Sequence, residues 1–419
     1  MKKILLLLLL FPTAIFAQKT TNQLYQEALE AYEEQDYELY LERLRSADEQ
    51  RPNHPTIVYK LAGAWSLNGR RTRSVQKLNQ LMLMDATIDF QSDSDFDNIR
   101  KHKQYDDLVA LQKWLTRREI HDEVFLQIDA AELHPESFAV LNDGTVLLGS
   151  VREKKIVKVQ PDGTYVDFVE TPYAVLGMKF DSLTNTLWAA TAAMPEMLGF
   201  EPADNGKSVV LQIDVENELI LQGLEYDEGS IIGDIYPDSE KRLWLSNSMS
   251  PYLSRDDTDT TNYYGAFTRK QFDLTNTHFN LQGLALTDDE QYLYFSDYIS
   301  GLFRVNIATD DIEQVFAPST SLLKGIDGLY YYRNSLIAIH NGTKPYKVVQ
   351  YFLDESGTNI LVERVINRGG ESLGEPTLGQ VKDGYFYYLA NSPWPAYDEH
   401  KNLNVDNWGL IEIRRIKLD

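Results

Sequence analysis

The 419-residue sequence contains no cysteine, which excludes disulfide bonds, thiolate metal ligands and a thiol nucleophile. Histidine is also scarce, with seven residues that form no cluster in the sequence. A metal site in this chain would therefore use oxygen ligands, which suit Ca²⁺ or Mg²⁺ better than zinc. The sequence also lacks a metalloprotease helix motif, a phosphate-binding glycine-rich loop and a Gly-x-Ser-x-Gly nucleophile turn.

Positive charge is in deficit. The chain has 40 Lys and Arg residues against 63 Asp and Glu residues, which gives a formal net charge of −23. A surface this acidic repels the phosphate backbone of nucleic acids and the head groups of anionic lipids. Nucleic acid and membranes are therefore not expected partners.

Long hydrophobic runs are missing except at the N-terminus, where an apolar stretch from Ile4 to about Phe16 follows Lys2 and Lys3 and precedes Ala17. A positive start, a short apolar core and a small residue at the cleavage point predict a secretory signal peptide over residues 1–17. An uncleaved anchor is the alternative, although the run is short for a membrane span. Without cysteine, lipid attachment after the run is excluded. We expect an exported protein, periplasmic or secreted, of bacterial origin.

Residues 18–118 show helical spacing with few glycines and no convincing alternation. Two stretches superimpose at an offset of 34 residues, with small residues at matching close-approach positions. The matched residues are Leu24, Ala28, Ala31, Tyr40, Leu44 and Ala47 against Val58, Ala62, Trp65, Ser74, Leu78 and Leu81. This spacing resembles the tetratricopeptide family, which implies a groove for a protein partner. A helical bundle without repeats is the alternative.

Residues 119–419 repeat one phrase six times: an inner-strand opening, a turn and a second strand. The openings are PESFAV, VLGMKF, IGDIYP, LQGLAL, IDGLYY and EPTLGQ, and the second strands are TVLLGS, TLWAAT, RLWLSN, YLYFSD, SLIAIHN and YFYYLAN. Units this small bury their faces by packing radially, so the repeats predict a six-bladed β-propeller. Segment 123–129 is expected to join the last blade beside segment 408–418, which removes the open edge. Two stacked β-sandwiches are the alternative.

The innermost strands of a propeller run along its axis, so the residues that open the six copies should face one space. These residues are Glu136, Leu176, Asp234 or Ile232, Gln282, Asp327 and Glu375. Carboxylates gathered there would repel one another unless they are protonated, hydrogen-bonded or neutralised by a cation. The residues that end the second strands are polar too, and we expect them to widen the channel into a polar funnel: Ser150, Thr191, Asn247, Asp297, His340 and Asn391.

The motifs Pro135-Glu136, Gln282-Gly283-Leu284-Ala285 and Asp327-Gly328-Leu329 resemble those of the gluconolactonase and regucalcin (senescence marker protein) family. The resemblance spans about 290 residues and implies a divalent cation, Ca²⁺ above all, held by Glu136, Gln282 and Asp327. It also implies that Asp327 is the base in lactone opening. The family's second asparagine ligand has no match, because IIGDIYPD places Ile231 or Gly233 there.

Two functions follow from these expectations. In the first, the helical repeats bind a protein partner and the propeller binds a small ligand, with Asp234, Asn247, Asp297, Glu375, Asn391 and Trp394 around it. In the second, the propeller is a metal-dependent lactonase or esterase in which Asp327 or His340 takes a proton from water. The sequence leaves both open.

Overall fold

The computed structural model describes residues 19–419 apart from 227–228, 258–267, 275–276 and 407. The predicted signal peptide lies outside the described residues. The described chain forms two compact units, one up to Met82 together with Ile88–Leu111, the other Leu83–Thr87 together with Gln112–Asp419. Among the helices of the described chain, none has the length and apolar character that crossing a membrane requires.

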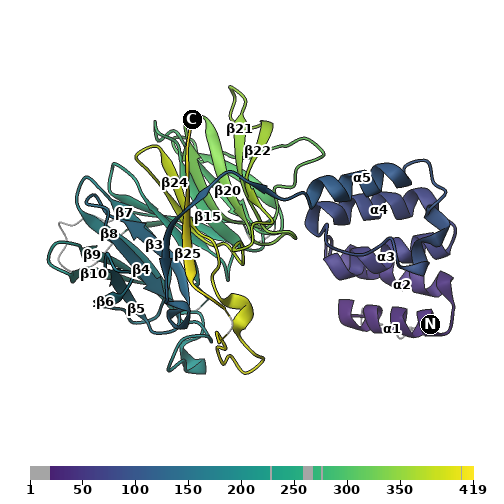
Figure 1. Ribbon diagram of the computed structural model, residues 1–419, viewed down its shortest axis with the longest axis horizontal. Helices are drawn as coiled ribbons and strands as arrows, with labels where there is room; N and C mark the ends of the chain where they lie inside the picture. The colour runs from purple at the N-terminus through teal and green to yellow at the C-terminus, as the bar shows by residue number, and fades with distance from the viewer. Residues whose placement is uncertain (1–18, 227–228, 258–267, 275–276, 407) are drawn as a thin grey trace, which may run out of the picture. The chain divides into compact units, whose positions relative to one another are not determined.

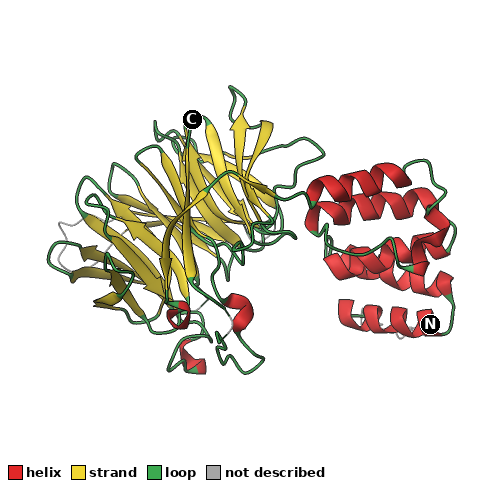
Figure 2. Ribbon diagram, in the orientation of Figure 1, coloured by secondary structure: helices red, strands yellow, loops and turns green. Residues whose placement is uncertain are grey.

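The first unit is built from helix pairs (Figures 1 and 2). Its elements are α1 (Thr21–Glu33), α2 (Tyr37–Gln50), α3 (Pro55–Leu67), α4 (Arg71–Met84), η1 (Ser94–Ile99) and α5 (Tyr105–Leu115). A capping box between Thr20 and Gln23 starts α1, and Pro55 occupies the first turn of α3, where its missing N–H costs nothing. The second pair begins 34 residues after the first, at Pro55 against Thr21. Assignment to the tetratricopeptide family stays a prediction.

The second unit contains six antiparallel sheets, which are the blades of a six-bladed β-propeller. Blades one to three comprise β3 (Pro135–Val140), β4 (Val146–Ser150), β5 (Lys155–Val159) and β6 (Tyr165–Glu170); β7 (Ala174–Asp181), β8 (Thr186–Ala192), β9 (Ser208–Asp214) and β10 (Leu219–Tyr226); and β11 (Ile232–Pro237), β12 (Arg242–Asn247), β13 (Tyr252–Asp257) and β14 (Thr268–Asp273).

Blades four to six comprise β15 (Leu281–Leu286), β16 (Tyr292–Asp297), β17 (Gly301–Asn306) and β18 (Ile312–Gln314); β19 (Ile326–Tyr332), β20 (Ser335–His340), β21 (Lys347–Leu353) and β22 (Ile360–Arg368), with β1 (Glu119–Ile120) at the edge; and β23 (Gly379–Lys382), β24 (Tyr385–Leu389), β25 (Ile411–Lys417) and β2 (Glu123–Ile128). The short η2 (Ala131–Leu133), η3 (Pro202–Asp204) and η4 (Trp394–Ala396) lie in loops. All six predicted second strands are second strands of blades.

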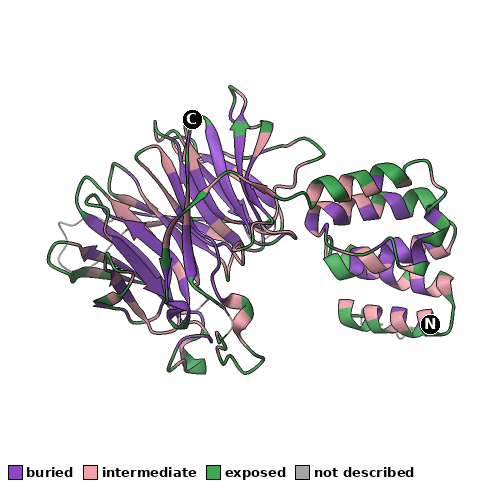
Figure 3. Cartoon of the chain, viewed as in Figure 1, coloured by how far each residue is buried: buried purple, intermediate pink, exposed green. Residues whose placement is uncertain are grey.

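The ring closes in the last blade as the sequence predicts. Strand β2 pairs antiparallel with β25, from Glu123 opposite Arg415 to Ile128 opposite Ile411. The inner strands β3, β7, β11, β15, β19 and β23 each contact the next, and β23 contacts β3. The apolar core fills the spaces between neighbouring blades, where the strands are mostly buried (Figure 3). The Gln380 side chain adds a polar link, accepting from the Val140 N–H at 2.7 Å and donating to the Val140 carbonyl at 3.2 Å.

Each of the first five inner strands is irregular where it begins. The register between inner and second strand shifts, so that residues are left unpaired in a β-bulge. The bulged residues are Glu136, Leu176, Gly233, Gln282 with Gly283, and Asp327 with Gly328. Glycine is needed at two of them because neighbouring inner strands approach closely. A Cβ on Gly283 would lie 2.6 Å from the Asp327 carbonyl, and one on Gly328 would lie 2.9 Å from the Thr377 carbonyl.

Candidate functional site

The bulges surround a cavity of about 420 Å³ at one end of the propeller channel, which we call the carboxylate pocket. Its polar wall contains Glu136, Asp234, Ser248, Asn280, Gln282, Tyr298, Asp327, Asn341 and Glu375. Its apolar wall contains Leu176, Met194, Ile231, Met249, Leu378 and Trp394, beside the backbone of two glycines. None of these described lining residues is Lys or Arg, so no basic side chain in the wall neutralises the carboxylates.

Glu136 comes from the bulge of β3 and is oriented by the last blade. Its Oε2 accepts hydrogen bonds from Trp394 Nε1 at 2.6 Å and from Ser392 Oγ at 3.1 Å. Burial raises the pKa of Glu136 well above its usual range, and the nearby charges of Asp327 and Glu375 raise it further, while the two hydrogen bonds oppose the shift.

Asp327 comes from the bulge of β19, two blades away around the ring. Its Oδ2 accepts a hydrogen bond from Asn341 Nδ2 at 2.7 Å, and Asn341 Oδ1 accepts one from the Tyr298 hydroxyl at 3.0 Å. Burial raises the pKa of Asp327 to about 7, with smaller contributions from the charges of Glu375 and Asp234. Both shifts oppose the ionisation of two carboxyl groups in one pocket, and a positive charge between them would favour it.

Gln282 and Glu375 complete the polar wall. Gln282 donates from Nε2 to Asn280 Oδ1 at 2.5 Å, which fixes the orientation of its amide, and its Oε1 has only a long contact with Ser248 Oγ at 3.5 Å. Glu375 accepts a hydrogen bond from the Tyr346 hydroxyl at 3.2 Å. Burial raises the pKa of Glu375, and the Tyr346 hydrogen bond and the Lys344 charge partly offset this effect.

Asp234 lines the pocket, but its carboxylate joins two blades. The bulged residue of the third blade is Gly233, which lies between Ile232 and Asp234, the two residues expected to open this copy. Gly233 is one of the two residues expected at the family's second asparagine, so this blade presents no side chain there. Asp234 Oδ2 accepts from the Leu284 N–H of the next blade and Oδ1 from the Ile235 N–H, each at 2.9 Å. Burial raises the pKa of Asp234, and the charge of Lys179 opposes the shift.

The expected polar funnel is not formed by the residues that end the second strands, because none of them is among the residues that line the pocket. Their side chains bind backbone groups of neighbouring loops and strands instead. Two of them accept several backbone N–H groups: Asn247 accepts those of Ile231, Met249 and Ser250, and Asp297 accepts those of Phe279, Asn280, Ile299 and Ser300. Asn391 accepts the Glu412 N–H and donates to the Leu410 carbonyl. The hydroxyls of Ser150 and Thr191 donate to the carbonyls of Leu133 and Val209 respectively.

His340 is likewise buried outside the pocket. Its Nδ1 lies 3.2 Å from the Lys324 carbonyl and its Nε2 lies 2.9 Å from the Tyr351 hydroxyl. Burial holds the pKa of His340 well below its usual value, so the ring is neutral and structural. It has no route to a substrate in the carboxylate pocket.

Sequence reasoning missed the residues that do extend the polar wall. Each of them directly follows a residue that ends a second strand: Ser248 follows Asn247, Tyr298 follows Asp297 and Asn341 follows His340. The alternation of side chains along a strand carried the signal, since neighbours in sequence point to opposite sides.

The pocket has oxygen atoms that fit a cation. Glu136 Oε1 and Asp327 Oδ1 accept no hydrogen bond from the described residues, and Gln282 Oε1 has only its long contact. In the described chain no three His, Cys, Asp or Glu side chains are grouped to hold a metal, so a cation here would take two carboxylates and an amide oxygen.

No family model matches the chain, and no curated protein sequence matches it. Propellers among solved structures resemble it weakly. The PQQ-bound aldose sugar dehydrogenase of Streptomyces coelicolor is 14% identical, with a TM-score of 0.44 over 72% of this chain and 99% of that one. The gluconolactonase XC5397 of Xanthomonas campestris is 11% identical, with a TM-score of 0.46 over 72% and 98%. Selenomethionine-substituted virginiamycin B lyase of Staphylococcus aureus is 13% identical, with a TM-score of 0.45 over 72% and 100%. Likenesses this distant carry no argument about activity, and the fold rests on the six sheets themselves.

Proposed function

We propose that the propeller is a binding module for a small ligand in the carboxylate pocket, with a divalent cation, Ca²⁺ in the first place, held by Glu136, Gln282 and Asp327. The observation that carries this proposal is the pair of half-buried carboxyl groups from blades one and five, each with one oxygen that accepts no hydrogen bond from the described residues. Positive charge in the pocket would remove the cost of ionising them. The apolar wall with Trp394 suits the carbon skeleton of a ligand.

The test is thermal unfolding of the full chain after EDTA treatment and then with added Ca²⁺, Mg²⁺ or Mn²⁺. A cation that binds the native state raises its stability by about 2.7 kcal/mol at a hundred times the dissociation constant. We expect this shift in the wild type and its loss in Glu136→Gln and Asp327→Asn. Glu355→Gln is the matched control, because it removes one negative charge from an exposed loop. No shift in the wild type, or equal shifts in all four proteins, would reject the cation.

A second candidate function is a metal-dependent lactonase or esterase of the gluconolactonase type. The observation in its favour is Asp327, whose pKa of about 7 and unbonded Oδ1 suit a group that takes a proton from water near neutral pH. A bound cation would supply polarisation of the ester carbonyl. His340 is not part of this candidate, because it lies outside the pocket. Hydrolysis of lactones and aryl esters by the wild type, lost in Asp327→Asn and kept in Glu355→Gln, is the expected result; no hydrolysis leaves the binding function.

In this proposal the helical unit binds a protein partner, and the protein is exported from the bacterial cytoplasm. The support for the first is the offset of 34 residues between its helix pairs, with small buried residues at matched positions such as Ala28 and Ala62. The support for the second is the composition of residues 1–17 alone. Fractionation of bacterial cells that produce the protein, followed by sequencing of its N-terminus, tests export; protein found in the cytoplasm with Met1 intact would argue against it.

A further inference from the structure

The propeller has a second cavity, of about 410 Å³, which we call the lysine pocket. It is lined by the last residues of inner strands and the turns that follow, such as Lys179 of β7, Tyr236 of β11 and Tyr330 of β19. The carboxylate pocket lies where the same strands begin, so the two cavities stand at opposite ends of the channel. Neither the proposed cation nor the proposed ligand involves this second cavity.

Lys179 is the one basic residue among the described residues that line this pocket. The Nζ atom lies 4.6 Å from the centroid of the Tyr330 ring and 5.4 Å from that of Tyr236, within the range of cation–π attraction. Within the described chain Nζ has no hydrogen bond and no ion pair to a carboxylate. Asp234 feels its charge, but both Asp234 oxygens already accept backbone hydrogen bonds. The N–H donors of the Lys179 ammonium group are therefore available to a ligand.

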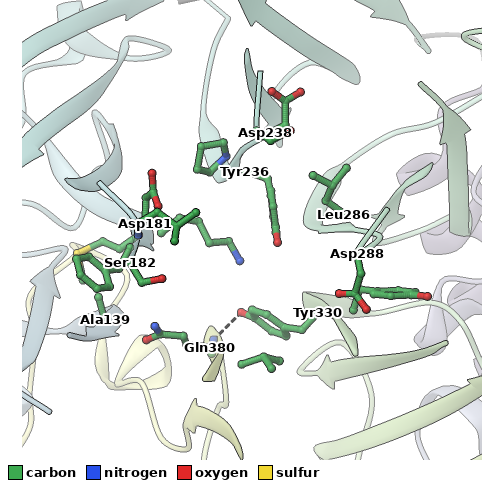
Figure 4. A pocket seen from close by; sticks show the side chains of 18 of the residues that line it. Ala139, Asp181, Ser182, Tyr236, Asp238, Leu286, Asp288, Tyr330 and Gln380 are labelled. Atoms are coloured by element: carbon green, nitrogen blue, oxygen red, sulfur yellow. Dashed lines mark hydrogen bonds between the residues drawn. The ribbon is translucent and has the colours of Figure 1, made fainter. Parts of the chain in front are cut away.

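Hydroxyl groups point toward the same space. In Figure 4 the rings of Tyr236 and Tyr330 reach toward the middle of the pocket, and the Ser182 side chain faces it from the side. The hydroxyls of Tyr236 and Ser182 have no partner among the described residues, whereas the Tyr330 oxygen accepts the Gly379 N–H at 2.5 Å. Burial raises the pKa of Tyr236 to about 12, which keeps its hydroxyl a donor at neutral pH.

Four acidic residues line the pocket: Asp181, Asp238, Asp288 and Glu290. Asp181, Asp238 and Glu290 accept hydrogen bonds from neighbouring residues, whereas Asp288 accepts none from the described residues. Asp238 points away from the middle in Figure 4 and accepts from Arg242 Nε at 2.7 Å and Trp244 Nε1 at 3.2 Å. Glu290 accepts from the Ser239 N–H and hydroxyl. The acidic charges oppose the entry of any anion, and of a multiply charged anion most. A bound carboxylate with one negative charge therefore depends on direct contact with Lys179.

We propose that the lysine pocket is a second binding site, which takes a small organic monocarboxylate with its carboxylate on the Lys179 ammonium and the Tyr236 hydroxyl. The volume admits a molecule of several carbon atoms, and Leu286 with the tyrosine rings provides an apolar surface for them. Charge-assisted hydrogen bonds to one ammonium and one hydroxyl distinguish a carboxylate from an amide of the same shape.

The experiment is calorimetric titration of the full-length protein with acetate, lactate and benzoate, and with phosphate and benzamide for comparison. We expect saturable binding of at least one of the three carboxylates and weaker binding of phosphate and benzamide. Lys179→Met should weaken that binding by about tenfold or more, because it removes a charged donor and keeps an unbranched side chain. Lys179→Arg should keep it within a few fold.

Two further variants keep the result interpretable. Tyr236→Phe removes one oxygen and should weaken binding by about three- to tenfold, even where Lys179→Met fails to fold. Asp327→Asn at the other end of the channel should leave carboxylate binding unchanged. The proposal is overturned if none of the three carboxylates binds the wild type, if phosphate binds as tightly as they do, or if the Lys179→Met or Tyr236→Phe protein binds like the wild type.

Discussion

The two ends of the channel are built from the same inner strands and both have acidic residues in their walls, but only one end also has a lysine among its described lining residues. At the bulged beginnings, Glu136 and Asp327 place unneutralised carboxyl groups around a cavity without Lys or Arg in its described wall. At the regular ends, alternation turns Lys179 and two tyrosine rings inward. A one-residue irregularity therefore decides which side chains face the axis, and a propeller acquires two different sites from one repeated strand.

The largest expected effect concerns what the two ends share, the close packing of inner strands. Gly283→Ala would put a Cβ 2.5 Å from the Leu329 nitrogen, so strands β15 and β19 must separate. We expect a loss of about 3 kcal/mol in the free energy of unfolding by urea, and loss of ligand binding at both pockets. Gly223→Ala in the outer strand β10, where the nearest atom would be 3.3 Å away, is the control and should cost less. Equal losses in the two variants would show that the ring tolerates widening.

The second prediction concerns the carboxyl end alone. The Asp327 pKa is about 7 in the folded protein against a usual 3.8, so between these values the native state holds a proton that the unfolded chain has lost. Stability of the cation-free protein should therefore fall as pH rises from about 4 to about 7, by at most about 4 kcal/mol in total, since each pKa unit is worth about 1.4 kcal/mol. Asp327→Asn should flatten this fall, as measured by urea unfolding in EDTA across that range. An unchanged slope in Asp327→Asn would place the ionisation elsewhere.

The third prediction separates the ends by the charge of what they bind. At ten times the respective dissociation constant, Ca²⁺ and the bound carboxylate should each stabilise the wild type by about 1.4 kcal/mol. Ca²⁺ should still stabilise Tyr236→Phe, and the carboxylate should still stabilise Asp327→Asn. Melting curves of the three proteins with each ligand give the comparison. If either substitution removed both shifts, the two cavities would act as one site.

The smallest expected effect concerns the hydrogen bond that the Trp394 side chain donates to Glu136. Trp394→Phe removes the hydrogen bond to Glu136 Oε2, which should cost about 1 kcal/mol and cost more as pH rises, because the donor favours the charged carboxylate. Trp408→Phe removes a hydrogen bond of 3.0 Å to the Asn391 carbonyl, which does not titrate. Urea unfolding at two pH values should therefore separate the variants. A cost for Trp394→Phe that is the same at both pH values would mean that Glu136 stays protonated throughout.

The propeller fold could be predicted because the same strand pattern occurs six times in the sequence, so an error in any one copy does not change the assignment. Six similar segments identified the second strands. Segment 123–129 could be assigned to the last blade because a propeller closes only when its one open edge is paired. The bulges were harder to place. In the third blade Asp234 or Ile232 was expected to open the copy, but the unpaired residue is Gly233 between them, because the motif does not show where the register shifts.

The candidate site could be predicted in part for the same reason. Glu136, Gln282 and Asp327 were located by position in the repeat, and the structure brings all three to one cavity. The polar residues that end the second strands looked equivalent to them in sequence, but they satisfy loop backbone groups that a sequence does not display. Lys179 escaped notice because a lysine between Met178 and Phe180 carries no motif, and only the fold brings two tyrosines from other blades to it.

The blade that closes the ring combines strand β2 with β25, the first and last long strands of the propeller. On the ribosome, the early strand must wait without its neighbour until residues 411–417 have emerged. Trp394 and Glu136 likewise meet across this seam, so the carboxylate pocket is assembled only after the whole chain has been translated. A nascent or prematurely terminated chain would contain most of the blades but not a complete carboxylate pocket.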